Sequence, residues 1–433
     1  MDQDLDLSLA TRPSNLTAVD GLIKDINGDE ETRHELVIKT RSLLQSLQTP
    51  REQMVQHTWA DMSINLKPPG LNAALITGVD TGLWKLMAKN GVAQPQKVGI
   101  LAKTLGVDAV LLGRLLRHVC AMGHPKETAQ DEYLLTNFTK ALALDVIGDG
   151  YVALIGGIGR SPIEFSKFLR KTNWQNPTDA AHTAMHASYQ TDAPNCFEYL
   201  RSIGLGPQTN HHSRYMKEPM GGYRQGRVPW MHPSLYPVEQ TLLQGANTSP
   251  DSPLLVDVAG GLGHDIDEFK KMYPNHPGVT ILQDLPVVIN DVRGIDPSIE
   301  LIGHDFLTEQ PIKGAKAYFM HSIMHDWPDD VCKKILAPLT EAMKPGYSKL
   351  LIFEVVIPRT GAYWEATAGD ILMMTQLSAL ERTEDHWHQL IEKSGLNLRI
   401  VKFWECGQSD VGNLIECELV PRDLQTSGAL TPS

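Results

Sequence analysis

A turn of small residues follows one apolar run in the C-terminal half of the chain, and an aspartate ends the next apolar run. The first run, residues 254–258, contains Asp257 and leads into a turn that includes Gly260, Gly261 and Gly263. Glycines let the backbone turn sharply and let a ligand approach the chain closely. The second run ends at Asp284, roughly twenty residues beyond the glycines, where a carboxylate can accept both hydrogen bonds from an adenosine ribose. This spacing indicates a site for an adenosyl ligand.

The same region disfavours a dinucleotide. A dinucleotide fingerprint has a third glycine three residues after Gly263, and this chain has Ile266 there. A third acid, Asp305, comes at the expected end of the following strand, where it could accept from an adenine amino group while Phe306 packs on the ring. An aspartate is also common as a helix cap or turn residue. Acids after successive strands favour the ligand interpretation.

The elements that must position these residues follow from the hydropathy pattern. Short apolar runs alternate with helical patterns from residue 253 onward, at 254–258, 279–283, 317–321 and 350–356. Such alternation predicts an α/β domain with a doubly wound parallel sheet. The helix after the glycine turn is expected to bury Ile266, Phe269 and the pair Met272-Tyr273.

The N-terminal part has mainly helical patterns. Residues 98–123 predict two helices joined at Gly106-Val107-Asp108, which resembles a helix-turn-helix within a winged-helix domain. The expected apolar face of the second helix is Val110, Leu111, Leu115, Leu116 and Val119. Its only basic side chains are Arg114, Arg117 and His118. Packing or a dimer contact is therefore favoured over DNA binding.

Composition narrows the class of protein. The chain has 433 residues and a formal charge of -12, which suits a protein of two or three domains and disfavours a nucleic-acid binder. Its five cysteines, Cys120, Cys196, Cys332, Cys406 and Cys417, are scattered without metal-ligand spacing and predict reduced thiols. The N-terminus lacks a signal-peptide pattern, and no apolar run reaches the roughly 18 residues that span a bilayer. We expect a cytoplasmic protein.

Five segments are expected along the chain. They are a leader at 1–30, a winged-helix dimerisation domain at 31–145, a helical linker contributing to a substrate pocket at 146–250, a Rossmann-like catalytic domain at 251–422 and a tail at 423–433.

Two further stretches carry a specific resemblance. The first is Met320-His321-Ser322-Ile323-Met324-His325-Asp326-Trp327-Pro328-Asp329-Asp330. The second is Glu381-Arg382-Thr383-Glu384-Asp385-His386-Trp387. With the glycine turn and Gln283-Asp284-Leu285-Pro286, they closely resemble the plant and fungal small-molecule O-methyltransferases of the caffeic-acid type, over residues 70–420. Tyr189-Gln190-Thr191-Asp192 resembles the fungal secondary-metabolite branch.

The resemblance implies S-adenosylmethionine (SAM) as cofactor, a homodimer and no metal. It places the catalytic base at His325 and two orienting acids at Glu354, which is expected to end its strand, and Glu381. The implied cofactor contacts are Asp257, Gly260, Gly261, Gly263, Asp284, Asp305, Phe306 and His321. Two positions depart from the pattern: Ala259 replaces the first glycine of the turn, and His321 stands where plant enzymes carry lysine.

These residues suit methyl transfer to oxygen. The acceptor oxygen must lie about 3 Å from the methyl carbon, in line with the sulfur–methyl bond. The hydroxyl must also lose its proton, and a histidine with a pKa of about 6.5 can accept it. A carboxylate on the other ring nitrogen would fix the tautomer. The alternative is that His325 caps the helix expected to start near Pro328.

The substrate is expected to be a hydroxylated small molecule. Met373, Met374 and Leu377 could line an adaptable apolar pocket, although a plain core stripe fits them equally. His182, His186 and Tyr189 are further pocket candidates. His211-His212 lacks ligand spacing and a nearby acid, which disfavours a metal site.

Two other functions remain open. Some relatives use bound SAM as a fixed positive charge and catalyse dehydration or pericyclic ring formation, often without the histidine base. Retention of His325, Glu354 and Glu381 favours methylation. The other rival is a cofactor-binding regulatory or scaffold protein that acts through its winged helix, which the acidic charge disfavours.

Overall fold

The structure is a computed structural model that describes residues 39–40, 43–60, 69–203, 228–405 and 412–420. The predicted leader and tail, His211-His212 and Cys406 lie outside these residues. The chain divides into two compact units. One comprises residues 1–164 and 188–226, and the other comprises residues 165–187 and 227–433. Neither unit is continuous in sequence, and the functional domain boundaries stay a prediction.

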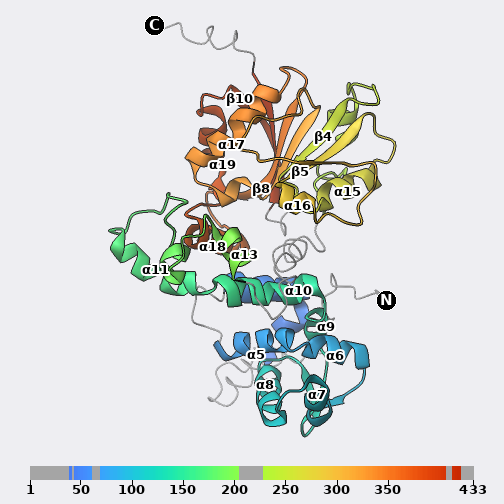
Figure 1. The fold of residues 1–433 in the computed structure, drawn as a ribbon, viewed down its shortest axis with the longest axis vertical. Helices are drawn as coiled ribbons and strands as arrows, with labels where there is room; N and C mark the ends of the chain where they lie inside the picture. The colour runs from blue at the N-terminus through green and yellow to red at the C-terminus, as the bar shows by residue number, and fades with distance from the viewer. Residues whose placement is uncertain (1–38, 41–42, 61–68, 204–227, 406–411, 421–433) are drawn as a thin grey trace, which may run out of the picture. The chain divides into compact units, whose positions relative to one another are not determined.

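The first unit is mainly helical, with a small antiparallel sheet (blue to green in Figure 1). Its elements, with two helices that cross the unit boundaries, are α3 (Pro50–Val55), η1 (Gln56–Ala60), α5 (Pro69–Asp80), α6 (Leu83–Asn90), β1 (Gln96–Lys97), α7 (Val98–Leu105), α8 (Ala109–Ala121), β2 (Lys126–Ala129), β3 (Glu132–Leu134), α9 (Asn137–Ala141), α10 (Asp145–Gly150), η2 (Tyr151–Ile158), α11 (Arg160–Lys171), α12 (Ala184–Tyr189) and α13 (Cys196–Ser202). The sheet order is β1-β3-β2.

Helices α7 and α8 confirm the two helices expected over residues 98–123. Gly106 ends α7 with a left-handed φ of 68°, and the Asp108 side chain caps α8 by accepting from the Leu111 nitrogen at 2.8 Å. The expected apolar face of α8 is partly wrong, because Val110 and Leu111 are 71% and 45% exposed. The buried stripe is Leu112, Leu116 and Val119. A helix that starts at residue 109 points its first-turn side chains at 110 and 111 away from that stripe.

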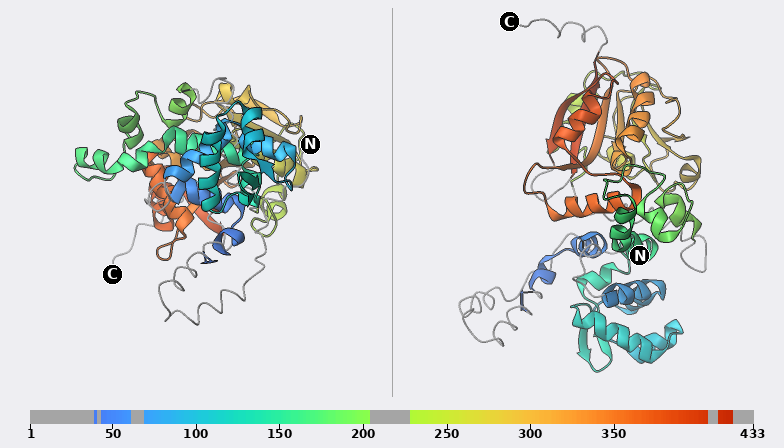
Figure 2. Two further views of the ribbon diagram at one scale, coloured as in Figure 1. Left: turned by 90° about the horizontal axis from the view of Figure 1, so that it is seen from below. Right: turned by 90° about the vertical axis from the view of Figure 1, so that its left-hand side faces the viewer.

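The second unit is a strand-and-helix domain (yellow to red in Figures 1 and 2). Its elements are η3 (Glu239–Leu243), β4 (Pro253–Val258), α15 (His264–Met272), β5 (Val279–Asp284), α16 (Pro286–Ile289), β6 (Glu300–Gly303), β7 (Ala317–His321), η4 (Met324–Asp326), α17 (Asp329–Ala342), β8 (Lys349–Ile357), α18 (Trp364–Leu377), β9 (Arg382–Thr383), α19 (Glu384–Glu392), β10 (Leu398–Glu405) and β11 (Gly412–Leu419). The main sheet has the order β10-β11-β8-β7-β4-β5-β6, and β9 pairs with β8.

The predicted doubly wound parallel sheet is confirmed. Strands β4 to β8 pair in parallel, and β10 and β11 add an antiparallel edge. The four expected strands are present within two residues of their predicted bounds. One detail is wrong: Glu354 lies inside β8, which continues to Ile357, because β9 pairs with the end of β8 at Val356 and Ile357.

Each face of the sheet is buried under its own apolar layer. Alternate side chains of β8 enter different layers, with Leu350 and Ile352 on the face covered by α17 and α19, and Leu351 and Phe353 on the face covered by α15. Figures 1 and 2 show these helices against the strands. Ile266 and Phe269 of α15 are buried as predicted, whereas Met272 and Tyr273 are only half-buried, because α15 ends at Met272.

The strand order reverses direction at β4, which lies between β5 and β7. In open parallel sheets, ligands bind outside the carboxyl ends of the strands at such a point. The glycine turn and the segment with Asp305 follow β4 and β6, and Asp284 and His321 end β5 and β7, so all of them lie at this edge. Among the described residues, none of the helices is both long and apolar enough to cross a membrane.

Candidate active site

The glycine turn closes tightly between β4 and β5. Ala259, Gly261 and Gly263 have positive φ values of 58°, 60° and 81°. At Gly260 a Cβ atom would lie 2.5 Å from Cγ of Asp257, so only glycine fits there. The Gly261 nitrogen donates to Oδ2 of Asp284 at 2.8 Å. The backbone therefore takes the conformation that a close ligand approach requires, and Ala259 adopts it without being glycine.

The two predicted adenosine acids lie at the ends of β5 and β6. Asp284 also accepts from the Leu285 nitrogen through Oδ1 at 2.7 Å. Exposed Asp305 accepts from the Leu307 nitrogen at 2.9 Å, and the Phe306 ring lies edge-on to Trp327 with centroids 6.2 Å apart. Both acids thus accept hydrogen bonds from backbone nitrogens of their own turns. Their contacts with a cofactor stay a prediction.

A buried amide pair joins the ends of these two strands. Gln283 and Gln310 exchange two hydrogen bonds, from Nε2 to Oε1, of 2.8 and 2.9 Å, and both side chains are 1% exposed. Gln283 precedes Asp284, and Gln310 closes the loop that carries Asp305 and Phe306. The pair fixes this loop against β5.

His321 ends β7 and contacts the first turn of α15. Its Nδ1 lies 2.9 Å from Oδ2 of Asp265, a residue that the sequence analysis did not identify. The His321 ring packs edge-on against Phe353, with centroids 4.7 Å apart. The imidazole is thereby oriented at the glycine-turn edge of the sheet, where the related plant enzymes carry lysine.

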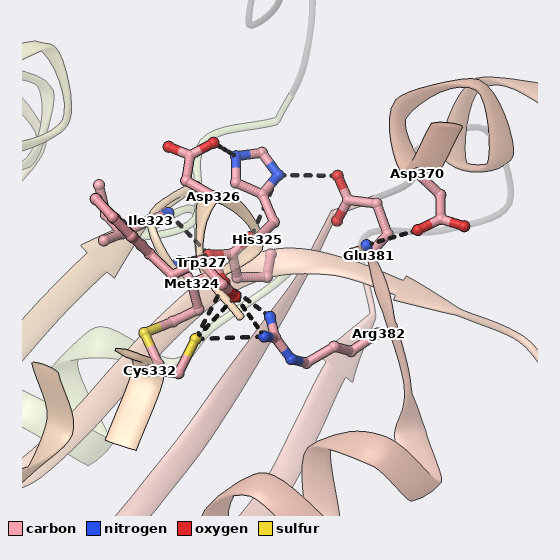
Figure 3. Close-up of polar contacts among 10 residues, drawn as sticks. Ile323, Met324, His325, Asp326, Trp327, Cys332, Asp370, Glu381 and Arg382 are labelled. Atoms are coloured by element: carbon pink, nitrogen blue, oxygen red, sulfur yellow. Dashed lines mark hydrogen bonds and ion pairs between the residues drawn. The ribbon is translucent and has the colours of Figure 1, made fainter. Parts of the chain in front are cut away.

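His325 lies in the short 3-10 turn η4, between the carboxylates of Asp326 and Glu381 (Figure 3). Its Nδ1 lies 2.8 Å from Oε1 of Glu381 and 3.8 Å from Oε2 of Glu354. Its Nε2 lies 3.5 Å from Oδ1 of Asp326. The side chain is 16% exposed. Pro328 is the N-cap of α17, so the alternative of a helix-capping His325 fails.

The two glutamates are themselves held in place. Oε1 of Glu354 accepts from the nitrogens of Ile323 and Met324 at 2.8 and 2.7 Å. The Glu381 nitrogen donates to Oδ1 of Asp370 on α18 at 3.0 Å. Among the described residues, Oε2 of Glu354 and Oε2 of Glu381 are buried without a hydrogen-bond partner. A buried carboxylate oxygen without a partner is destabilising, and the approach of each glutamate to His325, through Oε2 of Glu354 and Oε1 of Glu381, is the compensating interaction.

These acids control the protonation of the imidazole. Burial by itself lowers the pKa of His325, but the charges of Glu381, Glu354 and Asp326 outweigh it and raise that pKa well above its ordinary value. Burial raises the pKa of Asp326 to about 7 and raises the pKa of Glu354 as well. The cluster therefore stabilises a proton on His325.

The same three residues meet a distance criterion for a metal site. One ligand atom each from His325, Glu354 and Glu381 lies within 4.8 Å of the other two. In this structure Glu381 is already bonded to Nδ1 and Glu354 to two backbone nitrogens, which is the arrangement of an oriented base. The absence of a metal stays a prediction.

The predicted pocket residues fall into two groups. Met373 and Met374 are half-buried and Leu377 is buried on α18, the helix that also carries Asp370. His182 and His186 each bond a residue three positions earlier, and His182 is 82% exposed. Tyr189 belongs to the first unit, where its hydroxyl accepts from the Arg160 nitrogen at 3.1 Å. The described contacts therefore connect only α18 to the catalytic cluster.

Sequence reasoning missed one prominent residue of the site. Arg382, directly after Glu381, has a side chain that is 0% exposed, and it bonds the loop that carries His325. A buried arginine must be paired and fully hydrogen-bonded. Arg382 stands in the stretch that carried the family resemblance, but the residues next to it in the sequence do not mark it as buried.

Comparisons with known proteins found similar sequences and similar folds. A family model described as an O-methyltransferase domain matches residues 238–397. The O-methyltransferase asqD of Emericella nidulans is 32% identical over 393 residues, covering 90% of this chain and 98% of the relative. A solved structure described as LepI in complex with SAM has a TM-score of 0.72 and 28% identity, covering 94% of this chain and 99% of the other. Another, described as a pericyclic reaction enzyme, has a TM-score of 0.73 and 28% identity, covering 93% and 98%.

Proposed function

Because the chain belongs to the family of SAM-dependent O-methyltransferases, with relatives in fungal secondary metabolism, we propose that His325 is its catalytic base. The enzyme transfers a methyl group from SAM to a hydroxyl oxygen of a small molecule. The observation that carries the proposal is the 2.8 Å contact between Nδ1 of His325 and Oε1 of Glu381.

The residues at the glycine-turn edge fit this cofactor. Gly261 has a positive φ, and a Cβ built on it meets nothing within 4 Å, so the backbone leaves open space at this point. Asp257, Asp284 and Asp305 bring acidic groups to the carboxyl ends of three strands, which suits a ligand with a ribose, an amino group and a positive charge. Gly260, Gly263, Phe306 and His321 complete the proposed contacts. SAM supplies the electrophilic methyl group.

His325 would act through Nε2. Above the raised pKa of His325 the imidazole is neutral, and Glu381 then accepts a hydrogen bond from Nδ1–H, which leaves the lone pair on Nε2 for the proton of the acceptor hydroxyl. As that proton arrives, the imidazole gains a positive charge, and Glu381 and Glu354 stabilise it. Asp326, 3.5 Å from Nε2, lies on the side from which the hydroxyl would approach. Glu354 and Glu381 are thus proposed as orienting acids.

The competing function is a dehydration or pericyclic reaction that uses bound SAM without transferring its methyl group. It has support from the likeness to the structure described as a pericyclic reaction enzyme. The oriented pair of His325 and Glu381 favours transfer, because a base is needed to remove a hydroxyl proton. Incubation with SAM labelled on its methyl group and a panel of phenols and enols separates the two reactions. Label in the product supports transfer, and turnover of an acceptor without label contradicts it.

Several further assignments are part of the proposal. We infer that the acceptor is a phenol or enol and that Met373, Met374 and Leu377 line its site, with His182, His186 and Tyr189 as weaker candidates. We further propose a cytoplasmic homodimer that pairs through the winged-helix region and contains no metal. Equilibrium sedimentation tests the dimer, and retention of activity in a chelator tests the metal.

A further inference from the structure

The backbone of the turn that carries His325 is hydrogen-bonded by two side chains, one on each side. Glu354 accepts from the nitrogens of Ile323 and Met324 at the start of the turn. The guanidinium of Arg382 donates to the carbonyl oxygen of Met324 through Nη1 at 2.7 Å and to that of Trp327 through Nη2 at 2.8 Å. The amide N–H groups are thus held by a carboxylate and the carbonyl groups by an arginine. Figure 3 shows Arg382 pointing at this turn from the side opposite Asp326.

Arg382 is itself fixed. Nε and Nη2 bond Oδ1 of Asp329 at 3.0 and 2.9 Å, and Oδ2 of Asp329 lies 2.7 Å from Nε2 of His386. The guanidinium carbon lies 5.5 Å from the ring centroid of Trp387. Planar guanidinium groups form such forked and stacked contacts with little further loss of side-chain freedom, and lysine cannot reproduce them. The side chain has no place in the proposed proton transfer, since its donors all point into the protein.

Glu381 and Arg382 are neighbours in the chain, yet they contact opposite sides of the turn that carries His325. Arg382 starts the two-residue strand β9, which pairs with β8 through Val356. Successive side chains of an extended segment point in opposite directions. Glu381 therefore reaches the imidazole of His325 while Arg382 reaches the carbonyl groups beneath it.

We propose that Arg382 is a positioning residue that sets the distance between the His325 imidazole and Glu381 by clamping the carbonyl oxygens of Met324 and Trp327. A loosened turn would let the imidazole move away from Glu381. A carboxylate within hydrogen-bond distance raises the pKa of a histidine far more than a carboxylate further away. The proposal rests on the proposed role of His325. The position of the His325 ring relative to Glu381 can be tested without knowing the methyl acceptor.

The test is a histidine titration of the full chain by NMR, with the ring carbons labelled. The His325 signal is identified as the one of 16 histidine signals that is lost in His325→Asn. Arg382→Lys keeps the charge and removes the fork, and we expect it to lower the titration midpoint of His325 by about 1 pH unit. The unmodified protein, titrated under the same conditions, is the reference. Arg359→Lys, at a 77% exposed arginine, is the matched control and should leave the His325 midpoint unchanged.

Folding is checked by thermal melting and by the affinity for S-adenosylhomocysteine, which should change less than about threefold. If Arg382→Lys does not fold, Asp329→Asn decides, and a lowered His325 midpoint is again expected because the guanidinium loses a charged anchor. An unchanged midpoint in a folded variant overturns the proposal. Failure of His325 as the base would appear in methyl-transfer assays and would leave this titration unaffected, so the two ideas fail separately.

Discussion

Nδ1 of His325 lies 2.8 Å from Oε1 of Glu381, although 56 positions separate the two residues in the chain. His325 comes from the turn after β7, and Glu381 comes from the segment that joins α18 to β9. Strands β7 and β8 are neighbours, and β9 pairs with β8, so the sheet brings the two residues together. The acid orients an imidazole whose other nitrogen is left for the substrate.

Glu381→Gln should impair the orientation of the His325 imidazole without affecting the binding of SAM. Glutamine keeps the shape of the side chain and removes the charge that stabilises an imidazolium, so kcat should fall by about 100-fold or more while the affinity for SAM changes little. Turnover on an acceptor found in the product screen and calorimetry of SAM binding measure the two effects. Glu384→Gln, at the first position of α19, is the control on a neighbouring acid. Unchanged kcat in Glu381→Gln would contradict the role of Glu381.

SAM binding should depend on pH in a way that S-adenosylhomocysteine binding does not. The carboxylates of Glu381, Glu354 and Asp326 raise the pKa of His325 well above its ordinary value, against the effect of burial. Below that pKa the imidazole is charged and repels a sulfonium, and above it the imidazole is neutral. Deprotonation of Asp326, whose pKa burial raises to about 7, acts in the same direction.

The affinity for SAM relative to that for S-adenosylhomocysteine should therefore rise as pH increases through these pKa values. Both ligands carry the same amino acid group, so their ratio cancels its titration. Calorimetry between pH 6 and pH 9 is the measurement, with His325→Asn as the control that should weaken the trend. A ratio that stays constant across this range in the unmodified protein would show that the imidazole does not sense the sulfonium charge.

The Gln283–Gln310 pair should contribute to stability as a unit. Gln310→Leu leaves the buried amide of Gln283 without its partner and should lower the free energy of unfolding by about 1–3 kcal/mol. The double variant Gln283→Leu, Gln310→Leu removes both polar groups and should be less destabilised than the sum of the single changes. Denaturant unfolding of the four proteins measures this coupling. Strictly additive effects would mean that the two amides act independently.

The strands and the glycine turn could be predicted from the sequence because their signals are local. Residues 279–284 form an apolar run that ends in an acid, and the structure has β5 at Val279–Asp284. The two helices on either side of Gly106 were also predictable, since a left-handed glycine and a capping aspartate mark the break. The buried faces of those helices were harder to predict: Val110 is apolar yet exposed, because the stripe of α8 that is buried also depends on its packing against α5 and α7.

The catalytic pairings depend on contacts between distant segments, and only the resemblance to a known family indicated them. Glu354 was identified as an acid of the site, but its bonds to the nitrogens of Ile323 and Met324 follow from the register of β7 beside β8. The contact between Arg382 and Met324 spans 58 positions, and no periodicity links two such residues. Asp265 was likewise missed, because it lies in the first turn of helix α15 while its partner His321 ends strand β7.

The central claim is that His325 removes the proton from the acceptor hydroxyl, and transfer of a labelled methyl group tests it most directly. The measurement follows label from SAM into product for the unmodified enzyme, His325→Ala and Asp284→Ala. His325→Ala should lose turnover by about 100-fold or more and keep its SAM affinity, because only the base is removed. Asp284→Ala should lose SAM affinity and recover turnover at high SAM. Label entering product at the normal rate in His325→Ala would contradict the account.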